Sequence, residues 1–397
     1  MRIGIVAMSG IYPASIGGPE VYIYYLSREL ASQNNELHIF TRVENRNDLN
    51  KLKHISEEIP NVQIYPLVMK YNISNLLNLP VFLRQFKQIT QMFKKTVKKL
   101  DVIHYNAPPV DIAFIFALFA KRHSKIQTYF LHHGLFAEMG DILSNYGMPA
   151  QFEIVFQNLF RFLAKMKFFT RVIVPNNYAL NLAIKNGVSK AQTCRIRVGV
   201  DISRFQKADP FNLKGKPKIL FVGRLAKIKG IDVLLKAFNK LLPKYPESIL
   251  YILGKGEYRH YLERLAQKLD IEKSVNFLGF VSDDDLPRYL KSCDIFVVSS
   301  FRENQPITIL EAMASQIPVI ATNIEGIDEI IKHEENGLLV PKNDIESLAI
   351  EIIRLLEDRQ LFDALTKNGF TTVEKNHSYK HIGSKFTELF EELLKNR

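Results

Sequence analysis

Two glutamates stand eight residues apart in the stretch "FRENQPITILEAMASQIPVIA", residues 301–321. Pro306 lies between them, and proline is tolerated in the first turn of a helix but not in its interior. We therefore expect a helix to begin near Gln305 or Pro306. Glu303 then lies in the loop before the helix, and Glu311 lies about a turn and a half inside it. At ~1.5 Å of rise per residue, the two carboxylates could reach separate points on one elongated ligand.

The start of this expected helix is a candidate phosphate site. The first backbone N–H groups of a helix have no partner within the helix, so those of Ile307 and Thr308 would face an anion there. A carboxylate on either side suits hydroxyl pairs, as on a sugar and a ribose. The alternative is that Glu303 stabilises the helix dipole and Glu311 is a surface residue.

A basic pair occurs in "FVGRLAKIKGIDVLLKAF", residues 221–238. Arg224 and Lys229 lie five residues apart in an expected strand-to-helix loop. Arginine offers a planar fork of donors and lysine a mobile point charge, which together suit a diphosphate. The alternative is two solvated surface cations.

Two further stretches lie at the end of an expected strand or after it. Gly17 and Gly18 precede a helix in "GGPEVYIYYLSREL", where glycine lets the backbone approach a ligand and the helix start favours an anion. The alternative is that these glycines form a plain strand-to-helix turn that binds no ligand. His132 and His133 end the strand in "YFLHHGLF". A histidine there could contact a substrate hydroxyl or phosphate, or move a proton, or it could be a structural residue bonded to backbone.

Apolar strand-like runs alternate with helical patterns in both halves of the chain, which predicts parallel sheets. The expected strands are 2–8, 36–41, 62–67, 101–106, 126–134 and 171–176, then 218–223, 248–254, 275–280, 294–300, 318–322 and 337–341. The expected helices are 19–33, 81–99, 110–122 and 177–186, then 230–243, 257–269, 284–291, 306–315, 325–332 and 345–358. We predict an α/β protein of two Rossmann-like, doubly wound domains facing a cleft, with ligands beyond the carboxyl ends of the strands.

The predicted boundaries follow from these patterns. Residues 1–200 form the first domain, 201–217 read as a linker with Pro210, Gly215 and Pro217, and 218–375 form the second domain. Residues 376–397 carry a last helix that we expect to pack back on the first domain.

The net charge of +12 lies entirely in the first half of the chain. Residues 1–200 hold 24 Lys and Arg against 12 Asp and Glu, and the remaining residues hold 29 of each. The first domain should therefore favour an anionic partner. The two cysteines, Cys194 and Cys293, have no metal-ligand spacing and are expected to be reduced thiols. The N-terminal residues read as a strand rather than a signal peptide, and no apolar run approaches ~18 residues.

Acidic residues are missing from two stretches of the first domain. None occurs between Glu58 and Asp101, where residues 81–99 combine an apolar stripe with many lysines. From 142 to 200 the only acid is Glu153. Basic amphipathic helices rich in phenylalanine are typical of interfacial membrane association. The alternative is that the apolar stripes simply cover the sheet.

Taken together, these motifs resemble the retaining glycosyltransferases of family 4, which have the GT-B fold and a group 1 domain. The resemblance covers nearly the whole chain and is strongest from "RIRVGVDISRF" through "NGLLVPKND". It rests on several motifs in the right order rather than on any single one.

The resemblance implies a role for each candidate residue. Arg224 and Lys229 would bind the donor diphosphate, Glu311 the ribose, and Glu303 the donor sugar. The other implied contacts are backbone around Ile307 and Thr308 to phosphate, backbone near Phe280 and Val281 to the base, Gly17 and Gly18 to the donor, and His133 to sugar or acceptor. The reaction would retain the anomeric configuration and would need no metal and no cofactor.

Two departures from the family pattern bear on specificity and local structure. Asn304 and Gln305 stand where the family often has glycine and an aromatic residue, and we expect Asn304 to bond a sugar hydroxyl and so to affect the choice of donor. "VPNNYA", residues 174–179, has asparagine where serine is frequent.

We therefore expect a glycosyltransferase that uses a UDP- or GDP-linked donor. The basic first domain favours a membrane-borne acceptor, such as a lipid-linked glycan or glycolipid, and a cytoplasmic protein peripheral on the cytoplasmic face of the membrane. The alternatives are a glycosyltransferase with a soluble acceptor, a sugar-nucleotide epimerase or hydrolase of the same architecture, and a non-catalytic binder. The basic stretches carry no recognisable nucleic-acid motif, so we expect no nucleic-acid partner.

Overall fold

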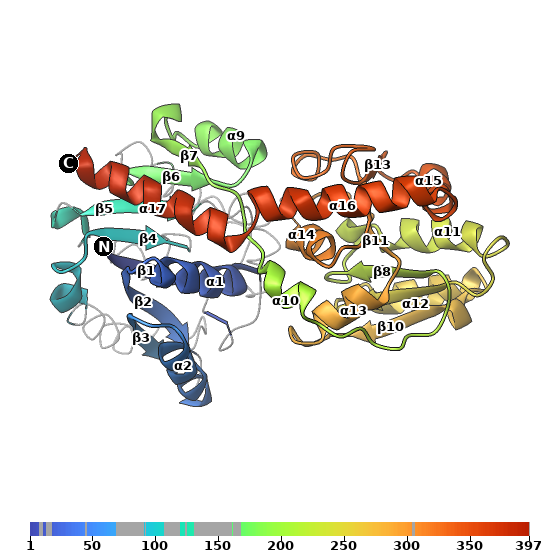
Figure 1. The fold of residues 1–397 in the computed structure, drawn as a ribbon, viewed down its shortest axis with the longest axis horizontal. Helices are drawn as coiled ribbons and strands as arrows, with labels where there is room; N and C mark the ends of the chain where they lie inside the picture. The colour runs from blue at the N-terminus through green and yellow to red at the C-terminus, as the bar shows by residue number, and fades with distance from the viewer. Residues whose placement is uncertain are drawn as a thin grey trace. The chain divides into compact units, whose positions relative to one another are not determined.

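The computed structural model describes residues 1–7, 11–12, 18–43, 46–68, 91, 93–106, 120–123, 125–130, 161, 168–303 and 306–396. The chain forms two compact units. Unit 1 comprises Met1–Val198 together with Tyr379–Arg397, and unit 2 comprises Gly199–Ser378. The chain therefore enters unit 2 once and returns to unit 1 for its last helix (Figure 1).

The described strands of unit 1 form one parallel sheet in the order β3-β2-β1-β4-β5-β6-β7. The strands are β1 (Arg2–Ala7), β2 (Glu36–Val43), β3 (Val62–Val68), β4 (Val102–Tyr105), β5 (Ile126–Phe130), β6 (Arg171–Val174) and β7 (Thr193–Arg195). In the centre, Ile5 pairs with Ile39 on one side and with His104 on the other. Because both faces of such a sheet are covered, most residues of the central strands β1, β2 and β4 are buried, including the polar His38, Thr41 and His104. Only β7 is absent from the strands predicted by sequence.

The helices of unit 1 include a pair formed by the two ends of the chain. Among the described residues of this unit the helices are α1 (Gly18–Ser32), α2 (Arg46–Glu58), α9 (Asn177–Lys185) and α17 (Tyr379–Lys395), with a short 3-10 turn η1 (Lys190–Gln192). Helix α17 lies beside α1 (Figure 1). Gly383 permits this close approach, because a Cβ there would lie 2.3 Å from Cγ of Glu29. Thr387 Oγ1 donates to Gln33 Oε1 at 2.5 Å, and Phe386 packs edge-on against His104 at 5.1 Å between ring centroids.

The described strands of unit 2 form a second parallel sheet in the order β10-β9-β8-β11-β12-β13. They are β8 (Lys218–Val222), β9 (Ile249–Leu253), β10 (Val275–Gly279), β11 (Ile295–Val298), β12 (Val319–Thr322) and β13 (Leu338–Val340). The helices are α10 (Ile202–Gln206), α11 (Ile231–Leu241), α12 (Arg259–Lys268), α13 (Leu286–Ser292), α14 (Ile307–Ala314), α15 (Ile345–Glu357) and α16 (Arg359–Asn376), with 3-10 turns η2 (Lys227–Lys229) and η3 (Glu272–Ser274).

Successive residues of the unit 2 strands enter two different cores. Ile219 and Phe221 pack with α11 and α15, whereas Leu220 packs with α10 and α14 on the other face. This alternation follows from the two-residue period of a strand. It produces a sheet with helices on both faces, which is the Rossmann-like arrangement predicted for each domain.

Four segments differ from their sequence interpretation. Residues 201–217, read as a linker, belong to unit 2, because Phe205 of α10 is buried in its core. Residues 325–332, predicted as a helix, form short turns, with Gly326 at φ +91° interrupting the helical path. Helices α2 and α16 were not among the predicted helices. In "VPNNYA", Asn176 caps α9 by accepting from the backbone N–H of Ala179 at 2.8 Å, so asparagine serves there as a helix cap.

In residues 93–99, the described end of the basic stretch 81–99, the apolar residues are buried and the lysines are exposed. Phe93 and Val97 are buried in the core of unit 1, so these two members of the apolar stripe cover the sheet. The exposed side chains of the same segment are lysines, at 94, 95, 98 and 99. The segment leads into β4, so these lysines lie near the amino ends of the strands. Among the described residues, no helix is long and apolar enough to cross a membrane.

Candidate functional site

The strand order of unit 2 defines where a ligand would bind. From β8 the chain continues to β9 on one side, whereas β11 lies on the other side of β8. The carboxyl ends of β8 and β11 therefore flank the switch point of a doubly wound sheet, where such folds bind ligands. The loop after β8 carries Arg224 and Lys229, and the loop after β11 carries Glu303.

Backbone contacts hold these two loops together. The N–H of Phe301 donates to the carbonyl of Ile228 at 2.8 Å, and Ser299 Oγ donates to the carbonyl of Lys229 at 3.1 Å. Gly230 follows in a left-handed conformation, φ +59°, and a Cβ there would lie 2.1 Å from the carbonyl oxygen of Ser299. Only glycine fits at this approach, so Gly230 allows the two loops to touch.

Lys229 and Glu303 form an ion pair at this junction. Lys229 Nζ lies 2.6 Å from Glu303 Oε1, and the same oxygen accepts from Ser300 Oγ at 2.6 Å. The side chains are 23% and 12% exposed. An ammonium group has three donors, so Lys229 can keep this contact while it donates to an anion. Arg224 is exposed in the same loop, directly after β8 and Gly223.

Helix α14 presents its N-terminus beside this pair. Pro306 occupies the N-cap position and provides no side-chain hydrogen bond, and the helix proper begins at Ile307. The predicted start was therefore correct to within one or two residues. The half-buried residues Ile307 and Thr308 are the first of the helix, where backbone N–H groups lack partners within the helix. Glu303 lies in the loop before the helix, as the sequence predicted.

Glu311 lies one turn further along α14 and is 9% exposed. Its neighbours on the helix, from Ile309 to Ala314, are buried as well, so the carboxyl group lies on a buried part of α14. Burial raises the pKa of Glu311 to about 7; the charge of Arg204 opposes this rise and that of Asp283 adds to it. The group therefore changes charge near neutral pH, which a surface glutamate would not do.

Phe280 and Val281 follow β10, which pairs with β9 on the side away from β8. Phe280 is 53% exposed, with Lys255 Nζ 5.6 Å from its ring centroid. Val281 packs partly against the core. The backbone beneath is fixed, because the N–H of Gly254 donates to the carbonyl of Gly279 at 2.7 Å. An exposed aromatic ring next to a cation suits the face of a nucleobase.

The structure brings together only part of the predicted site. Arg224, Lys229, Glu303 and Glu311 all lie on the loops and the helix that follow β8 and β11. Gly18 is the first residue of α1, in unit 1. Gly17, His133 and Asn304 lie outside the described residues, and their expected contacts stay predictions.

Three charged residues near this site were missed by sequence reasoning: Arg204, Asp283 and Lys255. Arg204 belongs to the segment that had been read as a linker, and nothing in its local pattern points to Glu311, more than a hundred positions away. A short helical signal was present, because Asp201 caps α10 by accepting from the N–H of Ser203 at 3.1 Å.

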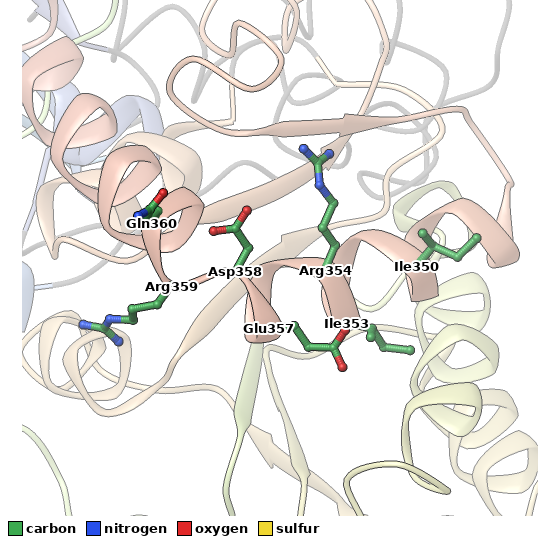
Figure 2. Close-up of a pocket in the computed structure, with 7 residues that line it drawn as sticks. All are labelled: Ile350, Ile353, Arg354, Glu357, Asp358, Arg359 and Gln360. Carbon is green, nitrogen blue, oxygen red and sulfur yellow. The ribbon is translucent and has the colours of Figure 1, made fainter.

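A separate hollow of about 700 Å³ lies at the junction of α15 and α16 (Figure 2). It is lined by Ile350, Ile353, Arg354, Glu357, Asp358, Arg359 and Gln360. Helix α15 begins after the carboxyl end of β13 and runs back toward the amino ends of the strands. The hollow at its end therefore lies away from the carboxyl ends of β8 and β11. Its charges are engaged: Glu357 pairs with Lys244, and Arg354 pairs with Glu334 and Glu351. We assign it no role in the site.

Among the described residues, no group of three or more His, Cys, Asp or Glu side chains is placed to hold a metal ion.

Two Rossmann-like units, one with this arrangement of basic and acidic side chains, define a protein of the GT-B class. The family model for glycosyl transferases group 1 matches residues 203–372, and the model for glycosyltransferase family 4 matches residues 16–204. The chain belongs to these glycosyltransferases, as its resemblance to them had indicated.

Curated relatives match either one part of the chain or all of it. An uncharacterized glycosyltransferase of Methanocaldococcus jannaschii is 38% identical over 172 residues, which is 43% of this chain and 44% of the relative. A second from the same organism is 23% identical over 99% of both chains. The lipopolysaccharide core biosynthesis glycosyltransferase LpsE of Rhizobium meliloti is 33% identical over 173 residues, 44% of this chain and 49% of LpsE. For the first of these and two other curated glycosyltransferases, the match covers less than half of the relative's own length.

Solved structures agree on the fold. Sucrose-phosphate synthase from Thermosynechococcus elongatus superposes with a TM-score of 0.76 at 24% identity, covering 100% of both chains. HepE from Anabaena, in complex with UDP and glucose, superposes with a TM-score of 0.72 at 21% identity, covering 98% of this chain and 99% of HepE.

Proposed function

We propose that this protein transfers a sugar from a UDP- or GDP-linked donor to an acceptor, with retention of the anomeric configuration. The observation that carries the proposal is the Lys229–Glu303 pair. It joins a diphosphate-binding loop to a carboxylate at the switch point of the unit 2 sheet, directly before the uncapped start of α14. A basic group, a helix N-terminus and a carboxylate placed in sequence match a sugar linked to a diphosphate.

Each end of the donor has a partner in this arrangement. Arg224, Lys229 and the N–H groups of Ile307 and Thr308 bind the diphosphate, and Glu303 contacts the sugar. Glu311 accepts hydrogen bonds from the ribose hydroxyls. Backbone at Phe280 and Val281 contacts the base, as the HepE complex with UDP makes reasonable for this fold.

The positive charges of the site act on the leaving group. During transfer, the bond from C1 of the sugar to the phosphate oxygen breaks. The acceptor oxygen bonds to C1 on the same face, and its proton leaves with the nucleoside diphosphate. Negative charge develops on the departing phosphate, where Arg224 and Lys229 stabilise it. In this proposal the reaction needs no metal ion, and His133 and Asn304 contact the sugar or the acceptor.

The acceptor side of the proposal rests on unit 1. Its charge excess and the exposed lysines at 94, 95, 98 and 99 favour an anionic surface. We propose a lipid-linked glycan or glycolipid acceptor and a peripheral position on the cytoplasmic membrane face. The name of LpsE, a relative in lipopolysaccharide core biosynthesis, supports this class of acceptor. Because Phe93 and Val97 are buried, the described part of the basic stretch would act by charge rather than by insertion.

Donor binding is tested by thermal shift with UDP- and GDP-linked sugars. A ligand that binds only the folded chain raises its apparent stability, by about 2.7 kcal/mol at a hundred times its Kd. We expect a shift with at least one donor and a smaller one for Glu311→Gln. Product analysis with donor alone separates the rival activities: epimerised or free sugar formed rapidly without acceptor would favour an epimerase or hydrolase.

The membrane proposal is tested by flotation with phosphatidylglycerol vesicles at low and high salt. We expect binding that weakens with salt and that is lost when the lysines at 94, 95, 98 and 99 are replaced by glutamine. The control replaces four exposed lysines of unit 2, at 207, 216, 268 and 273, and should still bind. Failure of the wild-type chain to float at low salt would exclude the membrane claim and leave a soluble acceptor.

A further inference from the structure

The loop after β9 places a lysine beside the exposed ring of Phe280. Lys255 stands between Gly254 and Gly256 in this loop, is itself exposed, and has its Nζ 5.6 Å from the centroid of the Phe280 ring. Within the described part of the chain, no carboxylate forms an ion pair with this ammonium group. Lys255 therefore presents an uncompensated positive charge, with three N–H donors, next to an exposed aromatic ring.

Close backbone contacts hold the loop of Lys255 against the loop after β8. The N–H of Leu225 donates to the carbonyl of Lys255 at 2.9 Å. A Cβ at Gly256 would overlap the carbonyl oxygen of Leu225, and a Cβ at Gly254 would overlap that of Gly223. Both glycines are therefore required for this approach, which fixes the backbone of Lys255 on this side.

On its other side the same loop is joined to the end of β10. The N–H of Gly254 donates to the carbonyl of Gly279 at 2.7 Å, and Phe280 follows Gly279 directly. The backbones that carry Lys255 and Phe280 are thus fixed relative to each other. A side chain that starts from such a fixed backbone is suited to selecting one ligand over another.

The position of the ammonium group along the sheet favours contact with a base over contact with a phosphate. Strand β9 lies between β10 and β8, and β11 lies on the far side of β8. The diphosphate partners proposed above, Arg224 and Lys229, follow β8, whereas Phe280 follows β10. From the middle loop, Lys255 extends its side chain toward the β10 side, where its Nζ meets the Phe280 ring. A nucleotide with its diphosphate at β8 and β11 would have its base beside this ammonium group.

The bases of the two proposed donors share one group that an ammonium ion binds. Uracil carries an oxo oxygen at C4 and guanine carries one at C6, and both are hydrogen-bond acceptors. Cytosine and adenine carry an amino group at the corresponding carbon, and this group is a donor. An ammonium group has donors only, so it pairs with the oxo oxygen and is repelled by the amino hydrogens.

We propose that Lys255 is a specificity-determining residue for the donor base: its ammonium group donates a hydrogen bond to the oxo oxygen of a uracil or guanine that lies against Phe280. This inference rests on the proposed function, because it assumes that a nucleotide sugar binds at the carboxyl ends of the unit 2 strands. Paired aromatic rings have centroids about 4.5–7 Å apart. The rim of a base against Phe280 is therefore within reach of an ammonium group 5.6 Å from the same ring centroid. Lys255 thereby selects against cytosine and adenine.

The test measures binding of UDP, CDP, GDP and ADP at constant pH by calorimetry, using wild type, Lys255→Met and Lys255→Arg. We expect wild type to bind UDP more tightly than CDP, or GDP more tightly than ADP. Lys255→Met keeps an unbranched side chain but removes the charge and the donors. It should weaken the preferred nucleotide by about tenfold and leave its amino counterpart within about twofold. Lys255→Arg keeps a charged donor and should retain most of the preference.

UMP and GMP separate contact with the base from contact with the phosphates. If Lys255 binds the base, Lys255→Met should weaken the monophosphate of the preferred base by the same factor as the diphosphate. Equal losses for UDP and CDP, or for GDP and ADP, that shrink with the monophosphate would make Lys255 a phosphate ligand and overturn the inference. Unchanged binding of every nucleotide would also overturn it, because Lys255 would then be a solvated surface cation.

Lys273→Met is the matched control. Lys273 is exposed on η3, just before the amino end of β10, so its replacement removes the same charge far from the expected base. This variant should keep both the affinity and the base preference of wild type. A loss as large as that of Lys255→Met would show a general effect of charge, and the inference would fail.

A transfer assay with UDP- and GDP-linked sugars keeps a failure of this inference apart from a failure of the proposed function. If the base preference depends on Lys255 but no sugar is transferred, the proposed function fails and the role of Lys255 holds. If sugar is transferred while Lys255→Met keeps the wild-type base preference, the function holds and the inference fails. The inference also fails if wild type binds none of the four nucleoside diphosphates.

Discussion

Lys229 Nζ lies 2.6 Å from Glu303 Oε1, and the contact joins residues 74 positions apart in the chain. The two side chains reach each other because β8 and β11 are neighbours in the sheet and because Gly230 lets their loops touch. The two side chains are only 23% and 12% exposed, so the attraction between them is largely offset by the cost of removing both charges from water. In our proposal its value is positional: the pair fixes the Lys229 ammonium group for contact with the diphosphate and the Glu303 carboxylate for contact with the sugar.

Replacing Lys229 with alanine should cost activity rather than stability. Removal of one electrostatic contact to a developing negative charge typically lowers the rate by about 10²–10³-fold. We expect a loss of this size in kcat/KM, with a melting temperature close to wild type. Lys227, exposed in the same 3-10 turn, is the control, and Lys227→Ala should remain active. Equal losses in the two variants would mean that the effect is general charge, not the position of Lys229.

Glu303→Gln should abolish transfer while donor binding is largely kept. Glutamine can still accept from Ser300 and Lys229, so the loop should hold its shape. The negative charge beside the sugar is lost, and that charge matters most as positive charge develops at C1. Transfer rates and the thermal shift with donor are measured on the same preparation. A variant with full activity would remove the sugar contact from our proposal.

The sequence predicted most of unit 2 because its signals are local. The buried strands are continuous apolar runs, and glycine, proline and asparagine mark their ends. Glu303, Lys229 and Arg224 could be assigned to one site because each follows a strand and the carboxyl ends of parallel strands share an edge. The contact between Lys229 and Glu303 follows from the strand order, which the family resemblance implied but no single motif contained.

The parts that sequence did not give depend on tertiary contacts. Arg204 acts on Glu311 only because α10 packs on α14, and residues rich in proline and glycine around it suggested a linker instead. Phe93 and Val97 looked like a possible membrane-facing stripe, but a stripe has the same period whether it meets lipid or a sheet. Their burial settles these two positions in favour of the sheet.

Phe280→Ala should weaken donor binding with little effect on folding. The ring is 53% exposed, so its removal leaves no buried cavity, yet it offers a face next to the Lys255 ammonium group. We expect KM for the donor to rise by roughly three- to tenfold, corresponding to about 1 kcal/mol of lost stacking. Leu278, 39% exposed on β10, provides the control, and Leu278→Ala should leave KM unchanged. An unchanged KM in Phe280→Ala would mean that the base does not bind against this ring.

Gly230→Ala should destabilise unit 2 and disturb the site. A left-handed conformation costs a non-glycine residue about 1–2 kcal/mol, and here a Cβ would also meet the Ser299 carbonyl oxygen at 2.1 Å. Gly279→Ala separates the two effects, since Gly279 has φ +76° but its nearest Cβ neighbour would be Arg259 Nη1 at 3.6 Å. Chemical denaturation should therefore show a larger loss for Gly230→Ala. Equal losses would show that the backbone contact with Ser299 is easily relieved.

The pH dependence of stability should carry the signature of Glu311. Its pKa is raised by burial, from 4.5 to about 7 in the folded chain, with Asp283 adding to the rise and Arg204 opposing it. The folded state therefore binds a proton that the unfolded state has released between these values. The contribution of this group to stability is fully present below pH 4.5 and is lost as pH rises through about 7. At ~1.4 kcal/mol per pKa unit, the loss is on the order of 3 kcal/mol at most.

Glu311→Gln should remove this loss, because the amide stays neutral at every pH. We expect the variant to match wild type at pH 5 and to be the more stable of the two at pH 8, as measured by denaturant unfolding without ligand. Glu272→Gln, at an exposed position on η3, should keep the wild-type profile. Parallel pH profiles for wild type and Glu311→Gln would mean that the carboxyl group is ionised throughout. The donor would then meet a site whose charge does not respond to pH.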